Sequence, residues 1–470
     1  MLRPLPPALG CLAPLASIAL GLTAAWPVAM QARVLEPESL AAREPQVRVL
    51  LLQGAAAQLR AAAGAGSLRV RDGQGRPLLE WPVQQGAPQL QVDVQQGWLR
   101  LRTLAATEPE GSPVAAVAPE QLIARELWLE ALPAVGEPDP GLWLQQRRYR
   151  GRLQLRLEGN QLQVVNHVPL ETYLTSVVGS EMPASWPQEA LRAQAVAART
   201  YALKARKPAA IFDLQATTAS QVYKGVEAET PSTRAAVQGT RGLVLTYDDT
   251  LIDAVFHSSS GGSATESSGQ LWPRQLPYLV SVPDYDRESP VRQWRQPLEA
   301  AQLSQAFPEL GGVTAIEVLS TTATGRVRQA RVVGPSGQLL LSGAQLRSRL
   351  GLKSTWVRFE LMPLVQPELS PSPLPAALLP PAPVPPPLPA PASPALEVLQ
   401  LVAVGRGFGH GIGMSQWGAL GLARQGESFA AILRHYYRGT QLRPYGQVAS
   451  LARLGPGWAQ PQATALSVSP

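Results

Sequence analysis

Cysteine and lysine are the scarce residue types in this sequence of 470 residues. The single cysteine, Cys11, lies in the N-terminal leader, so the mature chain can form neither a disulfide nor a cysteine-based metal site. Only four of the 41 basic residues are lysine, and there is no dense basic run and no recognisable nucleic-acid-binding module. The net charge of +7 therefore favours anionic surroundings, such as a cell wall or a membrane surface, over nucleic acid as a partner.

Long apolar runs are confined to the leader. Arg3 is followed by an Ala- and Leu-rich run from Ala8 to about Ala29, with small residues near Ala29 and Ala32. This is the pattern of a signal peptide cleaved near Ala32, with an uncleaved membrane anchor as the alternative. Beyond the leader, no stretch reaches the roughly 18 apolar residues that a spanning helix needs. We therefore expect export to the periplasm or cell wall, as a cleaved protein or anchored by its leader.

Strong metal-binding patterns are missing as well. The four histidines, at 167, 257, 410 and 435, show no HExxH spacing. A metal held between His257 and His410 is an alternative, but the sequence predicts no metal and no cofactor.

Composition divides the chain into regions. Segment 363–394 holds 14 prolines and cannot form helix or sheet ladders. We predict a signal peptide (1–32), a β-rich N-terminal domain (33–145), a core (146–362), a proline-rich disordered insertion (363–396), the C-terminal part of the core (397–445) and a disordered tail (446–470).

Hydrophobic periodicity predicts an α+β fold with a mixed sheet and a central Ala-rich helix. Hairpin patterns recur in the N-terminal region, and Leu153–Leu157 and Leu162–Val165 flank a Glu-Gly-Asn turn. A helix that Pro169 opens has an apolar i, i+3, i+4, i+7 stripe and is expected to stop at Gly179. The next helix is expected to have Ser185 as N-cap and Gln188 completing a capping box. Its small-residue face, Leu191, Ala195, Ala198 and Ala202, suits a central buried helix.

Glu181 is the candidate acid in the loop expected between these helices. The negative end of the preceding helix dipole disfavours a carboxylate there, and Met182, Pro183 and Trp186 would desolvate it. Both effects raise a carboxyl pKa, and a general acid working near neutral pH needs a raised pKa. The alternatives are an exposed loop glutamate or one that forms a structural pair with Arg199.

Further candidates lie downstream. Arg199 could hold a polar or anionic sugar substituent or form an internal salt bridge, and Tyr201 points to another face of the same helix. The run His257–Gly262 offers backbone N–H groups and hydroxyls with little bulk, which suits close approach of a sugar chain; a glycine turn or a Ser–His nucleophile are the alternatives. The glycine-dense run Gly405–Gly418, with His410 and Gln416, fits close backbone packing beside a cleft better than a phosphate loop.

Four blocks together resemble the SpoIID/LytB family of stage II sporulation protein D and the amidase enhancers. They are VPLETYLTSVVGSEMPASWPQEALRAQAVAARTYAL, FDLQATTASQVYKG, AVFHSSSGGSATES with PYLVSVPD downstream, and GRGFGHGIGMSQWGALGLA. They fall in order across about 165 to 420 and leave out the leader, most of 33–145, the insertion and the tail. Some members carry Cys/His zinc ligands around the segment that matches 213–223, but here that segment has neither residue type.

The resemblance implies a lytic transglycosylase that cleaves the MurNAc–GlcNAc bond of peptidoglycan, possessing a SpoIID-like catalytic core. The catalytic glutamate falls on Glu181 and a functionally implicated arginine on Arg199. The substrate-binding candidates are Arg199, Tyr201, His257, Ser258, Ser260, Gly261, Gly262, His410 and Gln416. One carboxyl suffices, since it protonates the leaving oxygen and then accepts the muramic C6 hydroxyl proton as a 1,6-anhydro ring closes, unlike the usual two-carboxylate glycosidase.

A non-catalytic amidase enhancer that binds peptidoglycan and stimulates a partner cell-wall amidase is the alternative function. Both functions imply secretion and binding to glycan strands, which in sporulation members are already stripped of peptides. A role in general wall remodelling is expected as much as one in sporulation.

Overall fold

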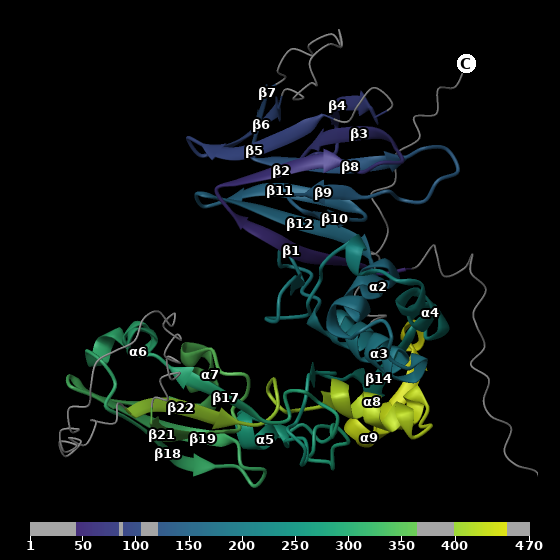
Figure 1. The fold of residues 1–470 in the computed structure, drawn as a ribbon. Coiled ribbons are helices and arrows are strands. Elements are labelled where there is room, and N and C mark those ends of the chain that lie inside the picture. The colour runs from purple at the N-terminus through teal and green to yellow at the C-terminus, as the bar shows by residue number, and fades with distance from the viewer. Residues whose placement is uncertain (1–43, 84–87, 105–120, 364–398, 449–470) are drawn as a thin grey trace, which may run out of the picture. The chain divides into compact units, whose positions relative to one another are not determined.

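The computed structural model describes residues 44–83, 88–104, 121–363 and 399–448 (Figure 1). The predicted leader, and nearly all of the predicted proline-rich insertion and tail, lie outside these residues. The described chain combines several β-sheets with α-helices, which confirms the α+β class. None of its described helices is both long enough and apolar enough to cross a membrane.

Two sheets make up the N-terminal part, and their inward residues form one apolar core. A seven-stranded sheet has the order β13-β1-β12-β11-β8-β3-β4, and a six-stranded sheet has the order β10-β9-β2-β5-β6-β7. On β8, alternate residues Leu127, Leu129 and Ala131 are buried, as expected for a sheet with one face on the core. The strands are β1 (Gln46–Gly54), β2 (Ala56–Ala61), β3 (Ala65–Asp72), β4 (Pro77–Pro82), β5 (Gln89–Gln95), β6 (Trp98–Leu104), β7 (Gln121–Ala124), β8 (Glu126–Pro133), β9 (Leu142–Leu144), β10 (Arg147–Tyr149), β11 (Arg152–Glu158), β12 (Gln161–Pro169) and β13 (Leu214–Gln215).

Strand pairing crosses the boundary expected at residue 145. Strand β12 lies between β1 and β11, and β11 pairs in turn with β8. The short strand β13 adds to the other edge of β1 in parallel, so this sheet is mixed. The division into a β-rich domain and a separate core is therefore not visible in the sheets, although the predicted β11–β12 hairpin is confirmed.

A helical layer follows, centred on α3 (Gln188–Ala205). Its small-residue face is fully buried, and the helix packs against α2, α4, α8, α9 and strand β14. Small side chains let neighbouring helices approach closely, so this confirms the expected central helix. The other elements of this layer are α2 (Leu170–Glu181), η2 (Val226–Ala228), α4 (Pro231–Gly239), β14 (Leu243–Tyr247), β15 (Thr250–Leu251), β16 (Phe256–His257), α5 (Ser268–Leu271), β23 (Met414–Ser415), α8 (Gln416–Arg424), α9 (Phe429–Tyr436), β24 (Gln441–Pro444) and η4 (Tyr445–Gln447).

Two helix boundaries differ from the sequence expectation. Gly179 does not stop α2, which continues to Glu181; a Cβ at Gly179 would overlap the carbonyl oxygen of Ala228, so this glycine serves close packing. The helix α3 has Pro187 rather than Ser185 as N-cap, and no side chain caps it. The predicted capping box is wrong because the Gln188 amide donates instead to the carbonyl oxygen of Ser232.

The strand that follows β14 is short. Pairing after the Asp248-Asp249 turn is confined to Thr250 and Leu251, which form β15 opposite β14. The neighbouring position on the other edge of β14 is taken by β24, from the C-terminal part of the chain.

A second apolar core lies in residues 294–363 and the strand after the proline-rich segment. Phe307, Val332 and Leu346 are fully buried there. Strands β21 and β22, on either side of the proline-rich segment, pair from Val357 opposite Gly405 to Pro363 opposite Leu399. The elements are β17 (Trp294–Leu298), α6 (Ala300–Ala306), η3 (Pro308–Leu310), β18 (Ala315–Thr321), β19 (Val327–Gly334), β20 (Gly337–Ser342), α7 (Gly343–Leu350), β21 (Val357–Pro363) and β22 (Leu399–Gly405).

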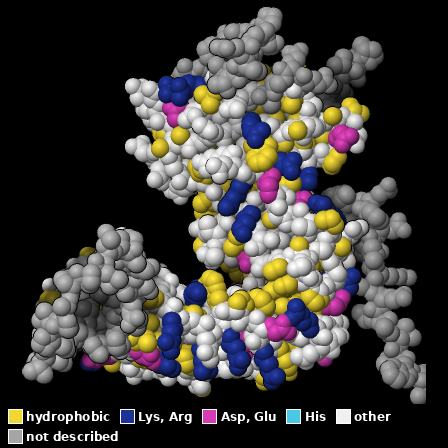
Figure 2. Space-filling model, in the orientation of Figure 1, with side chains coloured by type: hydrophobic (Ala, Val, Ile, Leu, Met, Phe, Trp, Pro, Cys, Tyr) yellow, Lys and Arg dark blue, Asp and Glu magenta, His cyan; other side chains and the backbone are white. Residues whose placement is uncertain are grey.

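Basic side chains are spread over the visible face of the molecule. Figure 2 shows Lys and Arg side chains in small separate groups rather than in one dense patch. This distribution matches the absence of a dense basic run from the sequence.

Candidate active site

Glu181 is the last residue of α2, and two distant segments of the chain reach its carboxyl group. One carboxyl oxygen, Oε1, accepts a hydrogen bond of 2.7 Å from the backbone N–H of Val222. The other, Oε2, accepts one of 3.3 Å from the side-chain amide of Gln416, the first residue of α8. Three of the four blocks singled out in the sequence thus converge on one half-buried carboxyl.

Burial dominates the electrostatics of this carboxyl group. Desolvation raises the pKa of Glu181, while the two hydrogen bonds and the positive charge of Lys224 act in the opposite direction without cancelling it. Its place in the last turn of α2, where the helix dipole is negative, adds to the preference for the protonated form. The group is therefore suited to donate a proton.

A pH profile should report this carboxyl group. A general acid must start protonated, so any glycan-cleaving rate should fall as the pH rises through the raised pKa of Glu181. Burial lowers the pKa of His410 to about 4. This imidazole therefore stays neutral in the pH range where Glu181 loses its proton, and its titration does not contribute to the fall in rate. Initial rates measured from acidic to mildly alkaline pH would check this; a rate that rose with pH would contradict an acid role for Glu181.

Gln416 lies where it can position Glu181. Its side chain is 6% exposed, which leaves little surface for the direct glycan contact expected from the sequence, and its amide instead reaches Glu181. The hydrogen bond favours the carboxylate and holds its orientation.

Replacement of Gln416 by leucine should therefore move the pH profile. The hydrogen bond from Gln416 lowers the pKa of Glu181, so its loss should shift the alkaline limb to higher pH and reduce kcat by roughly tenfold through lost orientation. If Gln416 contacted only the substrate, KM would rise and the limb would stay in place. Trp417→Leu, one residue along α8, is the control expected to raise KM without moving the limb.

Two half-buried tryptophans stand beside the carboxyl-bearing turn, and the sequence reasoning did not select them as site residues. The rings of Trp186 and Trp417 meet edge-on with their centroids 4.9 Å apart. Trp186 lies in the α2–α3 loop, and Trp417 directly follows Gln416. Their positions next to Glu181 and Gln416 in the chain were a usable signal, because partly exposed aromatic rings can pack on the apolar faces of sugars.

The glycine-dense run packs on the Ser/Gly run through its backbone. Strands β16 and β23 pair in parallel, with His257 opposite Ser415. The backbone N–H of Trp417 donates a 3.0 Å hydrogen bond to the carbonyl oxygen of Ser258. A Cβ at Gly409 would lie 2.6 Å from the Cβ of His257. The expected close backbone packing is thus present, and it fixes the start of α8, from which Gln416 extends.

Most of the Ser/Gly run is internal. His257, Ser260 and Gly261 are buried, so their side chains support the site rather than line its surface, whereas Ser258 and Gly262 are half-buried. His257 does meet a serine: its Nε2 lies 2.9 Å from Ser260 Oγ. Ser260 is fully buried, however, so this pair has no surface from which to attack a glycan.

The two core histidines are close together. The rings of His257 and half-buried His410 have centroids 5.4 Å apart. Both nitrogens of His257 already have partners, Ser260 Oγ and the Ile412 carbonyl oxygen, and burial lowers its pKa. Within the described residues, no group of three or more His, Cys, Asp or Glu side chains could hold a metal ion. In the segment 213–223, Asp213 pairs with Arg48 at 2.7 Å.

Arg199 lies inside the fold. It is fully buried and grips Glu171 of α2 with two hydrogen bonds, Nε to Oε1 at 2.9 Å and Nη2 to Oε2 at 2.6 Å. Its remaining donors reach the carbonyl oxygens of Leu243 and Val237. This is the internal salt bridge considered as the alternative, and a direct glycan contact is not open to a buried guanidinium. Tyr201, on another face of α3, is half-buried, and burial raises its pKa.

Comparison with known proteins decides the family. The sequence model of the Stage II sporulation protein family, SpoIID, matches residues 158–247. Stage II sporulation protein D of Bacillus subtilis (strain 168) is 32% identical over 306 residues, which cover 60% of this chain and 76% of that protein. The chain belongs to the SpoIID family.

Two further relatives are similar to this chain. Stage II sporulation protein D of Bacillus amyloliquefaciens is 31% identical, over 59% of this chain and 75% of that protein. The Amidase enhancer of Bacillus subtilis (strain 168) is 31% identical over 296 residues, which cover 58% of this chain but only 40% of that longer protein. The SpoIID match at 158–247 contains Glu181, Arg199 and Val222, and leaves out Gln416.

Proposed function

We propose that the chain is a peptidoglycan lytic transglycosylase that works in the cell wall, with Glu181 as its single acid and base. The observation that carries the proposal is the half-buried Glu181 carboxyl, whose pKa burial raises and whose two oxygens accept from Val222 and Gln416. Among the residues that the structure describes, the charged group that shifts the pKa of Glu181 is the cation Lys224 rather than a second carboxylate. Two carboxyls close enough to share a glycosidic bond would perturb each other, so a one-carboxyl reaction fits better.

The reaction needs two proton transfers at this one group. Protonated Glu181 gives its proton to the oxygen that links MurNAc C1 to GlcNAc, and the C1–O bond breaks. The resulting carboxylate is stabilised by the Val222 N–H and the Gln416 amide. It then accepts the proton of the MurNAc C6 hydroxyl as O6 bonds to C1, which closes the 1,6-anhydro ring and restores the acid. Trp186 and Trp417, which contact each other, would together offer an aromatic surface on which a sugar ring packs.

Purified chain incubated with peptide-free glycan strands tests the proposal. The expected products carry 1,6-anhydroMurNAc ends, recognised by mass spectrometry as species lacking one water relative to hydrolysed ends. Products with reducing MurNAc ends would make the chain a hydrolase, and no products at all would refute the enzyme proposal. The proposal places the protein outside the cytoplasmic membrane, as expected from its leader.

A second candidate function is stimulation of a cell-wall amidase. The resemblance to a protein named Amidase enhancer favours it. Two measurements distinguish the two functions. An enhancer would release no anhydro ends itself but would accelerate a purified amidase partner on intact peptidoglycan. The Glu181→Gln variant would accelerate the amidase as well as the wild type does.

A further inference from the structure

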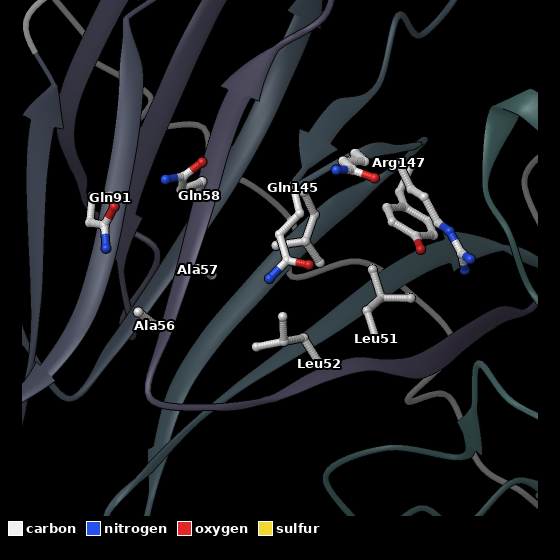
Figure 3. Close-up of a pocket in the computed structure, with 11 residues that line it drawn as sticks. Leu51, Leu52, Ala56, Ala57, Gln58, Gln91, Gln145 and Arg147 are labelled. Atoms are coloured by element: carbon white, nitrogen blue, oxygen red, sulfur yellow. The ribbon is translucent and has the colours of Figure 1, made fainter.

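A hollow of about 720 Å³ is lined by residues of β1 in the seven-stranded sheet and of β2, β5, β9 and β10 in the six-stranded sheet (Figure 3). None of the residues that line it belongs to the candidate active site. Four glutamines are among them, Gln58, Gln91, Gln145 and Gln146. Figure 3 shows the apolar side chains of Leu51 and Leu52 opposite Gln145.

The backbone around this hollow is held in place by the sheets. The pairing of β1 with β12 is irregular between Leu50 and Leu52, and the chain then passes through Ala55 into β2 of the other sheet. Gln58 on β2 and Gln91 on β5 are direct cross-strand partners. Gln145, at the turn between β9 and β10, donates its N–H to the Gln58 carbonyl oxygen at 2.8 Å. The backbone positions of Gln58, Gln91 and Gln145 at the edge of the hollow are therefore fixed by strand pairing and a backbone hydrogen bond.

These side chains offer unused hydrogen-bonding capacity. Among the described residues, no side-chain hydrogen bond is made by any of the four glutamines, although each amide can both donate and accept. The charged residue of the lining is Arg147, whose proximity lowers the pKa of the Tyr149 hydroxyl, whereas burial, the larger effect, raises it. The hollow is thus nearly neutral, with amide side chains and the two leucines Leu51 and Leu52 in its lining.

We propose that this hollow is a second glycan-binding site, which takes a strand of N-acetylated amino sugars. Such a sugar presents hydroxyl and acetamido groups along its edge and C–H groups on its ring faces, which matches a lining of amides and apolar side chains. An anionic polymer would need more cations than Arg147, and an apolar ligand would leave the amides unpaired. The choice of glycan as ligand rests on the proposed function; the existence of a site for a neutral, hydroxyl-rich ligand does not.

The test measures binding of two ligands, the N-acetylglucosamine hexamer and peptide-free glycan strands, to the full-length Glu181→Gln protein. This variant is used because it is expected to bind the ligand without cleaving it. Calorimetry gives affinity and stoichiometry, and hydrogen exchange by mass spectrometry locates the contact. We expect protection of residues 142–149, and a 10- to 100-fold loss of affinity at that site, on the order of two neutral hydrogen bonds, after Gln58→Ala/Gln91→Ala. Gln95→Ala, an exposed glutamine on β5 outside the hollow, is the matched control and should bind like its parent.

The outcomes separate this inference from the proposed function. Protection only around Glu181, or unchanged affinity in the double variant, would overturn the second site. Preferential protection by an anionic wall polymer or by a free stem peptide would overturn its assignment to glycan. If the wild type releases no anhydro ends yet the hexamer protects 142–149, the proposed function fails and this site stands; if cleavage occurs and 142–149 is unprotected, only this site fails.

Discussion

Glu181→Gln is expected to lower the release of anhydro-ended products by about a thousandfold or more. The glutamine keeps the size of the side chain and can still meet the Val222 N–H, but it has no proton to give and cannot act as the later base. General acid catalysis alone contributes roughly 10²- to 10⁴-fold, and here one group serves both steps. The measurement is the initial rate of anhydro-end formation by mass spectrometry on peptide-free strands.

Glu189→Gln provides the control for that variant. Glu189 lies at the start of α3 and is engaged elsewhere, with Arg192 at 2.7 Å and with the N–H of Phe429 at 2.7 Å. We expect its replacement to leave the rate per folded molecule close to that of the wild type. Equal rates for Glu181→Gln and the wild type would show that Glu181 is not the catalytic acid.

Arg199→Met is expected to lower the free energy of unfolding by about 3–5 kcal/mol. Removal of one member of a buried ion pair leaves the other charge in the interior without compensation, and Glu171 is only 5% exposed. Replacement of both partners, as Arg199→Met/Glu171→Leu, should recover much of the loss because no unpaired charge remains. Urea denaturation of the two variants and the wild type measures both effects.

Arg192→Met, on the same helix, is the matched control for a surface pair. Arg192 and Glu189 are both partly exposed, so the loss should stay below about 1 kcal/mol. If Arg199 instead held the glycan, Arg199→Met would raise KM and leave the unfolding free energy near that of the wild type. The KM and the unfolding free energy of Arg199→Met therefore decide between a structural and a binding role.

The sequence predicted those parts of the fold that depend on neighbours in the chain. The hairpin around Gly159 and the buried face of α3 follow from local alternation and spacing, and both are present. Gly179 shows the limit of that reasoning. A glycine near the end of a helical pattern commonly stops the helix, but here the deciding contact is with Ala228, 49 residues later. No local pattern contains that information.

In the candidate site, too, some features could be predicted from the sequence and others could not. Glu181 could be predicted from its chain context, because a helix end and apolar neighbours both affect a carboxyl pKa. The role of Arg199 could not, since it depends on Glu171 facing it from α2. Gln416 was selected for its glycine-rich surroundings, yet its position against Glu181 arises only from the pairing of β16 with β23. The sequence offered these residues as candidates, and tertiary packing determines which of them face each other.

The hydrogen bond from Gln416 to Glu181 has a consequence for biosynthesis. The two residues are 235 positions apart, so the second donor to the carboxyl is made and packed long after Glu181 has left the ribosome. A partly translocated or prematurely terminated chain would carry the acid without its fixed orientation. If the chain cleaves glycan as proposed, its full rate would therefore be reached only after its C-terminal part has folded and the Gln416 amide has met Glu181.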